Sequence, residues 1–288
     1  MELYNPDSSS TSSRISCSDA RCAAADQTGS AVCQTSESPS GLCGYDITYT
    51  DRTKVSGYYV SDMIYFDTTM GNQHSASSAS LVFGCANSVS HFLKTDGLLG
   101  FGRNQLSIVR QLHSQGVSPK VFSQCLKGSE GGGGILVLGK IDVPGLVFYK
   151  FYSGWPSYNL NLESIAVNGQ NLPIDSSLFA TSNSQGTVVD SGTTLAYLVD
   201  GMYEPLIGAI DAAKSPSVRS LDVKWNGKGK CYLSSSSIDM LFPTVTLYFK
   251  GGAAMTVKPS QYLLQQGTNC IMVYREMVFG AILLYQPV

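Results

Sequence analysis

Charged side chains and long apolar runs are both scarce in this chain of 288 residues. Asp, Glu, Lys and Arg together make up 14% of it, against about 25% in an average soluble domain. The 19 basic and 21 acidic residues include no Lys/Arg cluster, which argues against nucleic-acid binding. The longest apolar run, 277–285, contains Gly280 and is too short to cross a bilayer. We therefore expect neither a nucleic-acid partner nor a membrane span.

Histidine occurs only three times, whereas the eight cysteines are numerous and even in number. Cys17, Cys22, Cys33 and Cys43 lack the close Cys pairs and nearby His of a zinc site. We therefore expect no metal and no cofactor, and disulfides formed in an oxidising compartment. The sequence leaves open which of the three possible pairings these four cysteines adopt.

The first residues, Met-Glu-Leu-Tyr-Asn-Pro-Asp, have neither the basic nor the apolar region of a secretory signal peptide. The cysteine content indicates a secreted protein, whereas these first residues do not look like a secretion signal. An incomplete piece of a secreted protein would explain the disagreement.

The residues that are abundant favour β-structure, because hydroxyl and aromatic side chains suit half-buried pleated surfaces. Alternating segments at 45–49 and 57–65 flank the polar stretch 50–54 and predict a β-hairpin. Helices are expected at 107–114 and 200–213, and Asn168-Gly169 predicts a tight hairpin turn. Further strands are expected at 81–85, 97–101, 135–138, 160–167, 186–189, 245–249, 255–257 and around Cys270. The chain is thus expected to be all-β with few short helices, in two lobes, 1–152 and 153–288.

The motif that carries chemistry is Val188-Val-Asp-Ser-Gly-Thr-Thr194. An apolar strand delivers Asp190 to a tight turn, where the hydroxyls of Ser191 and Thr193 can orient its carboxylate. Gly192 is expected to let the backbone double back. Taken alone, such a motif is also compatible with an ordinary turn closed by an Asp side chain.

This motif resembles the second active-site motif of the pepsin-type aspartic endopeptidases, and the chain is most similar to their nepenthesin-like plant branch. The supporting segments, in chain order, are Ser56-Gly-Tyr-Tyr-Val-Ser-Asp62, Val82-Phe-Gly-Cys85, Asp96-Gly-Leu-Leu-Gly-Phe-Gly102, Val121-Phe-Ser-Gln-Cys-Leu126 and Tyr158-Asn-Leu-Asn-Leu162. The resemblance implies a bilobal pepsin-like fold, a monomer, and an extracellular or vacuolar location. It also implies a peptide or protein bound in a cleft between the lobes, and disulfides Cys85–Cys125 and Cys231–Cys270.

The family needs two aspartates that share one proton and activate a water, and this chain supplies only one. The nearest second candidate, Asp26-Gln-Thr-Gly-Ser30, contains an inserted Gln and follows Cys-Ala-Ala-Ala instead of an apolar strand. The first Asp-Thr-Gly-Ser segment is therefore missing, and we expect an incomplete first lobe. The closing Ile-Leu-Gly-Asp strand of the family is also absent, and Phe279-Gly-Ala-Ile-Leu283 is the candidate to take part of its place.

The resemblance places the substrate-covering hairpin, the flap, at Tyr49-Thr-Asp-Arg-Thr-Lys-Val55. Tyr49 and Asp51 match the family, whereas Thr50 and Arg52 replace both glycines of the tip. If those positions need a positive φ, the hairpin must bend differently or carry strain.

Three functions remain open at this point. The first is an aspartic endopeptidase homologue, inactive as the chain stands. The second is a catalytically dead peptide- or protein-binding module, since some plant relatives inhibit xylanases. The third is a homodimer in which two copies of Asp190 meet.

Overall fold

The computed structural model divides the chain into two compact units, Met1–Pro144 and Gly145–Val288. It describes residues 4–27, 29–33, 41–49, 52–70, 73–90, 96–126, 133–141, 144, 157–182, 185–193, 196–221, 230–233, 237–266, 270–273, 276–277 and 282–285. The expected lobe boundary at 152/153 lies outside these residues, so that division stays a prediction.

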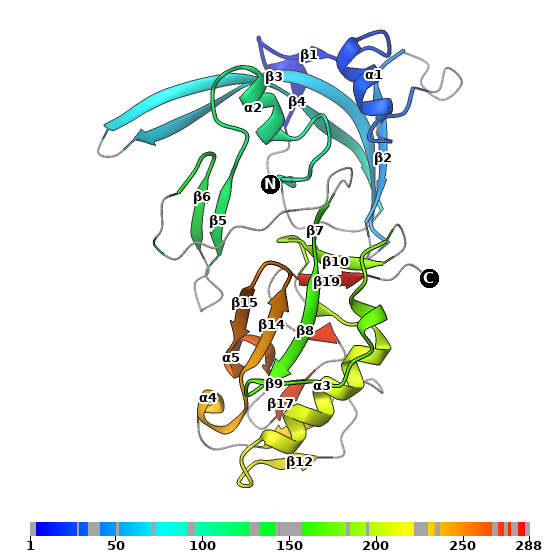
Figure 1. Cartoon of the computed structure of the whole chain (residues 1–288). Helices are drawn as coiled ribbons and strands as arrows, with labels where there is room; N and C mark the ends of the chain where they lie inside the picture. Colours follow the sequence, from blue (N-terminus) through cyan, green and yellow to red (C-terminus); the bar gives the residue numbers. More distant parts are fainter. Residues whose placement is uncertain are drawn as a thin grey trace. The chain divides into compact units, whose positions relative to one another are not determined.

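The first unit is built mostly from strands (Figure 1). Its elements are η1 (Pro6–Ser8), β1 (Ser13–Arg14), α1 (Ala20–Asp26), β2 (Gly44–Thr48), β3 (Lys54–Met70), β4 (Gln73–Val89), α2 (Ile108–Ser114), β5 (Ser123–Leu126) and β6 (Gly134–Val137). The predicted hairpin is confirmed, because β2 and β3 pair antiparallel from Gly44↔Tyr58 to Thr48↔Lys54. The helix expected at 107–114 and the strand at 135–138 are confirmed as α2 and β6.

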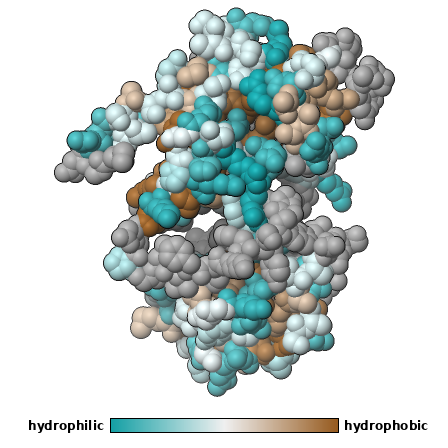
Figure 2. Space-filling model, turned by 45° about the horizontal axis from the view of Figure 1, so that its top comes forward, coloured by the Kyte–Doolittle hydropathy of each residue, from teal (hydrophilic) through white to brown (hydrophobic). Residues whose placement is uncertain are grey.

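Strand β3 organises this unit, because β1, β2 and β4 all pair with it. β3 and β4 are 17 residues each, far longer than the predicted strands 57–65 and 81–85, and they pair from Val55↔Val89 to Met70↔Gln73. The buried core lies under the β2–β3–β4 part, where Tyr45, Tyr59 and Val82 pack with Cys22 and Cys43. On the face shown in Figure 2, hydrophilic residues cover most of the described surface of this unit, and apolar residues break through in separate patches.

The strand expected at 97–101 does not form, and that prediction is wrong. Residues 97–101 carry no strand, and Leu98 and Leu99 are 60% and 63% exposed. A buried strand needs neighbours that satisfy its backbone groups, and none of the described strands pairs with this stretch.

The second unit contains three sheets and the longest helix of the described chain. Its elements are β7 (Tyr158–Leu160), β8 (Leu162–Val167), β9 (Gln170–Asn171), η2 (Ser176–Phe179), β10 (Gly186–Val189), β11 (Ala196–Tyr197), α3 (Asp200–Ala213), β12 (Arg219–Leu221), β13 (Lys230–Leu233), α4 (Ile238–Leu241), β14 (Val245–Phe249), β15 (Ala253–Val257), α5 (Pro259–Tyr262), β16 (Leu264–Gln266), β17 (Cys270–Val273), β18 (Glu276–Met277) and β19 (Ile282–Tyr285). The sheets run β18-β11-β19-β10-β7, β12-β13-β17-β16 and β15-β14-β8-β9.

One apolar core holds this unit together. Helix α3 contributes Met202, Leu206 and Ile210, all essentially buried, at the four-residue spacing that places side chains on one helix face. They pack in one cluster with Ile165 of β8 and Leu247 of β14. The helix expected at about 200–213 is confirmed as α3, whose apolar residues recur on one face over its 14 residues. Among the described residues, no helix has the length and apolar character needed to cross a membrane.

The Asn168-Gly169 turn is also confirmed. It joins β8 to β9, with φ of 48° at Asn168 and 78° at Gly169. Both values lie in the left-handed region that Asn and Gly tolerate best.

Candidate active site

Asp190 follows directly on β10, an interior strand of the five-stranded sheet of the second unit. β10 pairs with β7 on one side and with β19 on the other, and Val189 is paired with Tyr158 and Ile282. The strand is thus fixed on both edges up to the residue before the aspartate. The pairing by Ile282–Tyr285 also fits the expectation that the segment after Phe279 takes the place of the closing strand.

Local hydrogen bonds fix both oxygens of the Asp190 carboxylate. The Gly192 N–H donates to Oδ1 at 2.9 Å, and Thr193 Oγ1 donates to Oδ2 at 2.6 Å. The Thr193 N–H donates to the Asp190 carbonyl at 3.2 Å and closes the turn. Asp190, Ser191 and Gly192 are exposed. Each carboxylate oxygen therefore keeps a lone pair that can accept a hydrogen bond from a water or a substrate group.

Glycine is needed at position 192 for a different reason from the one expected. Its φ is not in the left-handed region. A Cβ at this position would instead lie 3.2 Å from Asp190 Oδ1, closer than ordinary van der Waals contact. The glycine lets its own N–H approach the carboxylate.

Within the described residues of the second unit, no second carboxylate is hydrogen-bonded to Asp190, whose partners are Gly192 and Thr193. In the first unit Asp26, the nearest look-alike in the sequence, ends helix α1 instead of a strand. Asp96 is exposed in a stretch without strand structure. Neither residue therefore has the strand-and-turn setting of Asp190.

The hairpin assigned to the flap closes through two backbone bonds. The Tyr49 N–H donates to the Thr53 carbonyl at 2.8 Å, and the Arg52 N–H donates to the Tyr49 carbonyl at 2.9 Å. The Tyr49 side chain is 38% exposed. Arg52 adopts a φ of 68°, a left-handed value that costs a non-glycine residue free energy. Asp51, the other predicted flap residue, lies outside the described residues.

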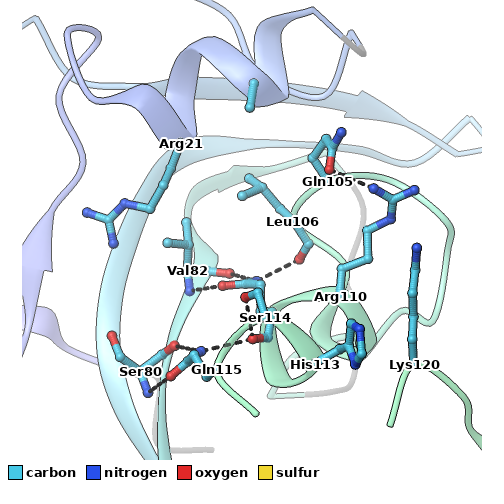
Figure 3. Close-up of a pocket in the computed structure, with 12 residues that line it drawn as sticks. Arg21, Ser80, Val82, Gln105, Leu106, Arg110, His113, Ser114, Gln115 and Lys120 are labelled. Carbon is cyan, nitrogen blue, oxygen red and sulfur yellow. Dashed lines mark hydrogen bonds between the residues drawn. The ribbon is translucent and has the colours of Figure 1, made fainter. Parts of the chain in front are cut away.

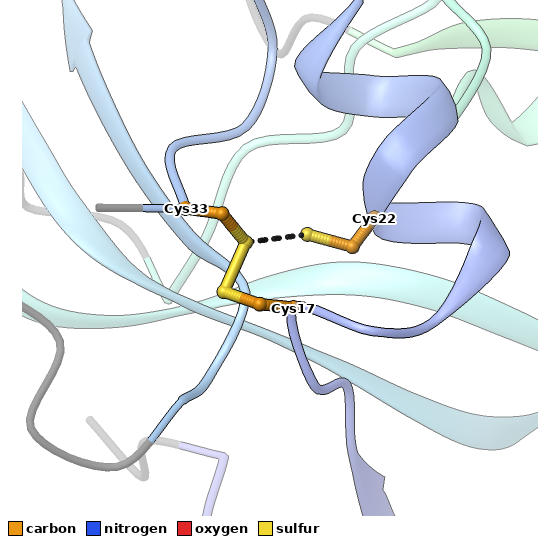
Figure 4. Close-up of side chains that lie close together, drawn as sticks. All are labelled: Cys17, Cys22 and Cys33. Carbon is orange, nitrogen blue, oxygen red and sulfur yellow. Dashed lines mark hydrogen bonds between the residues drawn. A yellow bond between two sulfur atoms is a disulfide. The ribbon is translucent and has the colours of Figure 1, made fainter. Parts of the chain in front are cut away.

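The four cysteines nearest the start of the sequence form two adjacent disulfides. Cys17 pairs with Cys33 and Cys22 with Cys43, with Cα–Cα distances of 5.7 and 5.8 Å. In Figure 4 the sulfur of Cys22 lies against that of Cys33, 3.2 Å away. This clustering has the compactness of a metal site. The sulfurs are nevertheless committed to disulfides, and a metal needs thiolates.

The other two predicted disulfides differ in outcome. Cys85 on β4 and Cys125 on β5 are free thiols, so the expected Cys85–Cys125 bridge is not formed. β5 pairs with β6 in a separate two-stranded sheet, whereas β4 pairs with β3. Cys231 is buried and disulfide-bonded. Its expected partner, Cys270, lies on the neighbouring strand β17, whose side chains are outside the description, so Cys231–Cys270 stays a prediction.

One carboxylate of the first unit, Asp62, has distant partners that the sequence did not predict. Asp62 of β3 accepts hydrogen bonds from Thr11 Oγ1 at 2.5 Å and from the Tyr4 hydroxyl at 2.7 Å. These bonds, Thr11 first and then Tyr4, lower the pKa of Asp62 to about 2. The partners lie 51 and 58 residues away in sequence. The acid thus ties the N-terminal stretch to the sheet.

Comparison with known proteins decides the family. Two family models match the chain: one described as xylanase inhibitor N-terminal over residues 1–140, and one described as xylanase inhibitor C-terminal over residues 157–284. Aspartic proteinase 36 of Arabidopsis thaliana is 32% identical over 269 residues, which cover 91% of this chain and 54% of the relative. Aspartic proteinase nepenthesin-1 of Nepenthes gracilis is 28% identical over 268 residues, 87% of this chain and 55% of the relative. The chain belongs to the pepsin-like aspartic proteinase family.

Solved structures agree on the fold of this pepsin-like chain. The crystal structure of basic 7S globulin from soybean matches with a TM-score of 0.68 at 19% identity, covering 96% of this chain and 77% of the globulin. The crystal structure of edgp matches with a TM-score of 0.70 at 17% identity, covering 98% and 79%. The expected fold class, mostly β and bilobal with few helices, is therefore confirmed. The pepsin-like chain spans about half the length of the curated relatives it matches.

Proposed function

We propose that Asp190 is one of the two catalytic carboxylates of an aspartic-type endopeptidase, and that residues 1–288 alone do not hydrolyse peptides. The observation that carries the first part is the exposed Asp190 carboxylate, held at Oδ1 by the Gly192 N–H and at Oδ2 by Thr193. Ser191 supports the same turn. A carboxylate fixed at both oxygens and open to solvent is suited to hold a water in one orientation.

The second part of the proposal follows from the protonation states that the reaction needs. Peptide hydrolysis by this chemistry needs one carboxylate to take a proton from the attacking water while the other, protonated, polarises the carbonyl. Two acids at close range share one proton because both cannot be charged together. Asp190 alone cannot hold both protonation states, and residues 1–288 contain no Asp-Thr-Gly-Ser segment that would supply the second carboxylate. Peptide binding does not need this pair and stays open.

The substrate of the proposed site is an extended peptide or protein segment. Family membership supports this class, and the exposed Tyr49 at the end of the β2–β3 hairpin supports its assignment to the flap, together with Asp51. We assign the chain to the nepenthesin-like branch, to the secretory pathway and to a monomeric state. The two disulfides of the first unit support an oxidising compartment.

The experiment is a cleavage assay of purified 1–288 on a denatured protein at mildly acidic pH, with and without a statine-type inhibitor. We expect no inhibitor-sensitive cleavage from the wild type, and no change in Asp190→Ala or in the control Asp26→Ala. Inhibitor-sensitive cleavage lost only in Asp190→Ala would contradict the proposed inactivity and would favour a dimer that brings two copies of Asp190 together.

A catalytically dead binding or inhibitor module is the second candidate. The match of 1–140 and 157–284 to models described as xylanase inhibitor domains favours it. The test adds 1–288 to a xylanase and follows release of reducing sugar. Inhibition that survives in Asp190→Ala would support the binding module, and its absence at stoichiometric excess would reject this target.

A further inference from the structure

The first unit contains a pocket that plays no part in the chemistry proposed for Asp190. Its volume is ≈560 Å³, and it lies between helix α1, strand β4 and helix α2 with its flanking loops. A volume of this size is within the range of small-molecule sites, about 300–1,000 Å³. Figure 3 shows Arg21 coming from the side of α1, while Arg110, His113 and Lys120 stand together on the opposite side.

Gln111 of α2 and Gln115, the residue after this helix, form a hydrogen-bonded floor for the pocket. The Val82 N–H donates to Gln111 Oε1 at 2.7 Å, and Gln111 Nε2 donates back to the Val82 carbonyl at 2.9 Å. Gln115 repeats the arrangement at Ser80, with distances of 3.2 and 2.8 Å. The two side-chain amides thus hydrogen-bond the backbone of β4 as a neighbouring strand would. The floor of the pocket is therefore uncharged, and its backbone groups at Ser80 and Val82 have hydrogen-bond partners.

The wall on the α2 side, by contrast, carries the positive charges of Arg110 and Lys120, and none of the lining residues is Asp or Glu. Arg110 donates at 2.7 Å to the uncharged Gln105. In the part of the chain that the structure describes, neither Arg110 nor Lys120 forms an ion pair.

Arg21 differs from the other lining cations. It is engaged by Asp19 through Nε and Nη2, at 3.0 and 2.7 Å. Its charge is therefore already balanced, and the excess positive charge lies on the α2 side of the pocket.

We propose that this pocket binds a small anion that carries carboxylate or phosphate groups. Arg110 and Lys120 supply the charge, because a guanidinium binds oxyanions through paired N–H groups and an ammonium acts as a point charge beside it. Leu106 and Val82 give the cavity an apolar portion that suits a carbon skeleton. The site is independent of Asp190, and its occupant is not the peptide proposed above.

Calorimetric titration of the full chain at low salt with citrate, inorganic phosphate and glucose tests the proposal. We expect saturable binding of citrate or phosphate and none of the neutral glucose. Citrate alone would identify a carboxylate ligand, and phosphate alone a phosphate ligand. Arg110→Gln with Lys120→Gln should weaken binding by about tenfold or more, since two charge-assisted contacts are lost.

The matched control is Lys140→Gln with Lys250→Gln, which removes two exposed lysines outside the pocket and gives the same net charge. It should bind the anion as the wild type does. If the double pocket variant melts below the wild type without ligand, Lys120→Gln alone, an exposed substitution, replaces it. Equal weakening in the control, or no saturable binding of either anion up to the millimolar range, would overturn the proposal.

Discussion

At the scale of single residues, Asp62 and Asp190 show two ways of holding a carboxylate. Asp190 is held by its own turn, through residues two and three positions later. Asp62 is held by Tyr4 and Thr11, more than 50 positions earlier. The first arrangement could be predicted from the sequence because local motifs encode it. The second could not, because no short pattern states which distant hydroxyl will reach an acid.

The lowered pKa of Asp62 predicts how stability depends on pH. A carboxyl whose folded pKa, about 2, lies below its ordinary value of 3.8 stabilises the fold above that ordinary value. The stabilisation is lost as pH falls toward 2. Asp62→Asn should therefore show a smaller loss of unfolding free energy between about pH 4 and pH 2 than the wild type, measured by denaturant unfolding. Asp46→Asn, which replaces an exposed carboxyl on β2, is the control. If the unfolding free energy of Asp62→Asn depends on pH as that of the wild type does, the stabilising role of the Asp62 hydrogen bonds is contradicted.

Arg52 predicts a stabilising substitution in the hairpin. Its φ of 68° costs a side-chain-bearing residue about 1–2 kcal/mol, whereas glycine adopts the value freely but loses more entropy on folding. Arg52→Gly should raise the free energy of unfolding by about 0.5–1 kcal/mol. Lys54→Gly, in the paired strand β3, should lower it by about the same amount. Denaturant unfolding of both variants measures these changes. A lower unfolding free energy in Arg52→Gly than in the wild type would show that the arginine makes contacts that outweigh its backbone strain.

At the scale of elements, regular patterns were predicted well and polar strands were not. Helix α3 and strands β2, β10 and β14 follow clear apolar periodicities, so their positions were predicted. The outer half of the β3–β4 hairpin is rich in Ser and Thr on both faces, and it therefore lacks the alternation that identifies a strand. Residues 97–101 present the reverse case, an apolar stretch that forms no strand because no described strand pairs with it.

Gly57 marks the closest approach of two strands. It lies at the bulge of β3, and a Cβ there would stand 2.1 Å from the Cys85 carbonyl oxygen of β4. Gly57→Ala should cost about 1–3 kcal/mol of unfolding free energy, because backbone must move to relieve the overlap. Gly100→Ala, where nothing lies within 4 Å of the added Cβ, should change it by less than about 0.5 kcal/mol. If Gly57→Ala and Gly100→Ala change the unfolding free energy equally, β3 and β4 are further apart at this bulge than the structure shows.

The two free cysteines predict the outcome of thiol labelling. Cys85 and Cys125 lie on strands of different sheets and are unpaired. Alkylation of the unfolded, non-reduced chain followed by peptide mapping should label Cys85 and Cys125 and leave the four cysteines of the two disulfides unlabelled, namely Cys17, Cys22, Cys33 and Cys43. Recovery of a Cys85–Cys125 linked peptide would instead reinstate the bridge implied by the family resemblance.

At the scale of the whole molecule, the fold was predictable and the activity was only partly so. The order of the motifs from Ser56 to Thr193 identifies a pepsin-like chain, since many weak signals in one order are jointly specific. Fold membership does not by itself fix function. The deciding feature is a second carboxylate beside Asp190, and neither Asp26 at the end of α1 nor the exposed Asp96 has the strand-and-turn setting of Asp190.

The most direct measurement is therefore a gain-of-function assay. An Asp-Thr-Gly-Ser strand segment taken from a nepenthesin-like relative is joined upstream of Met1, and cleavage of a denatured protein is followed at mildly acidic pH. The account predicts that the extended chain cleaves the substrate in a statine-sensitive manner, and that Asp190→Ala abolishes the cleavage while Asp26→Ala does not. An extended chain that folds, binds the statine-type inhibitor and still cleaves nothing, or one that cleaves equally well in Asp190→Ala, would contradict the assignment of Asp190 as half of a catalytic pair.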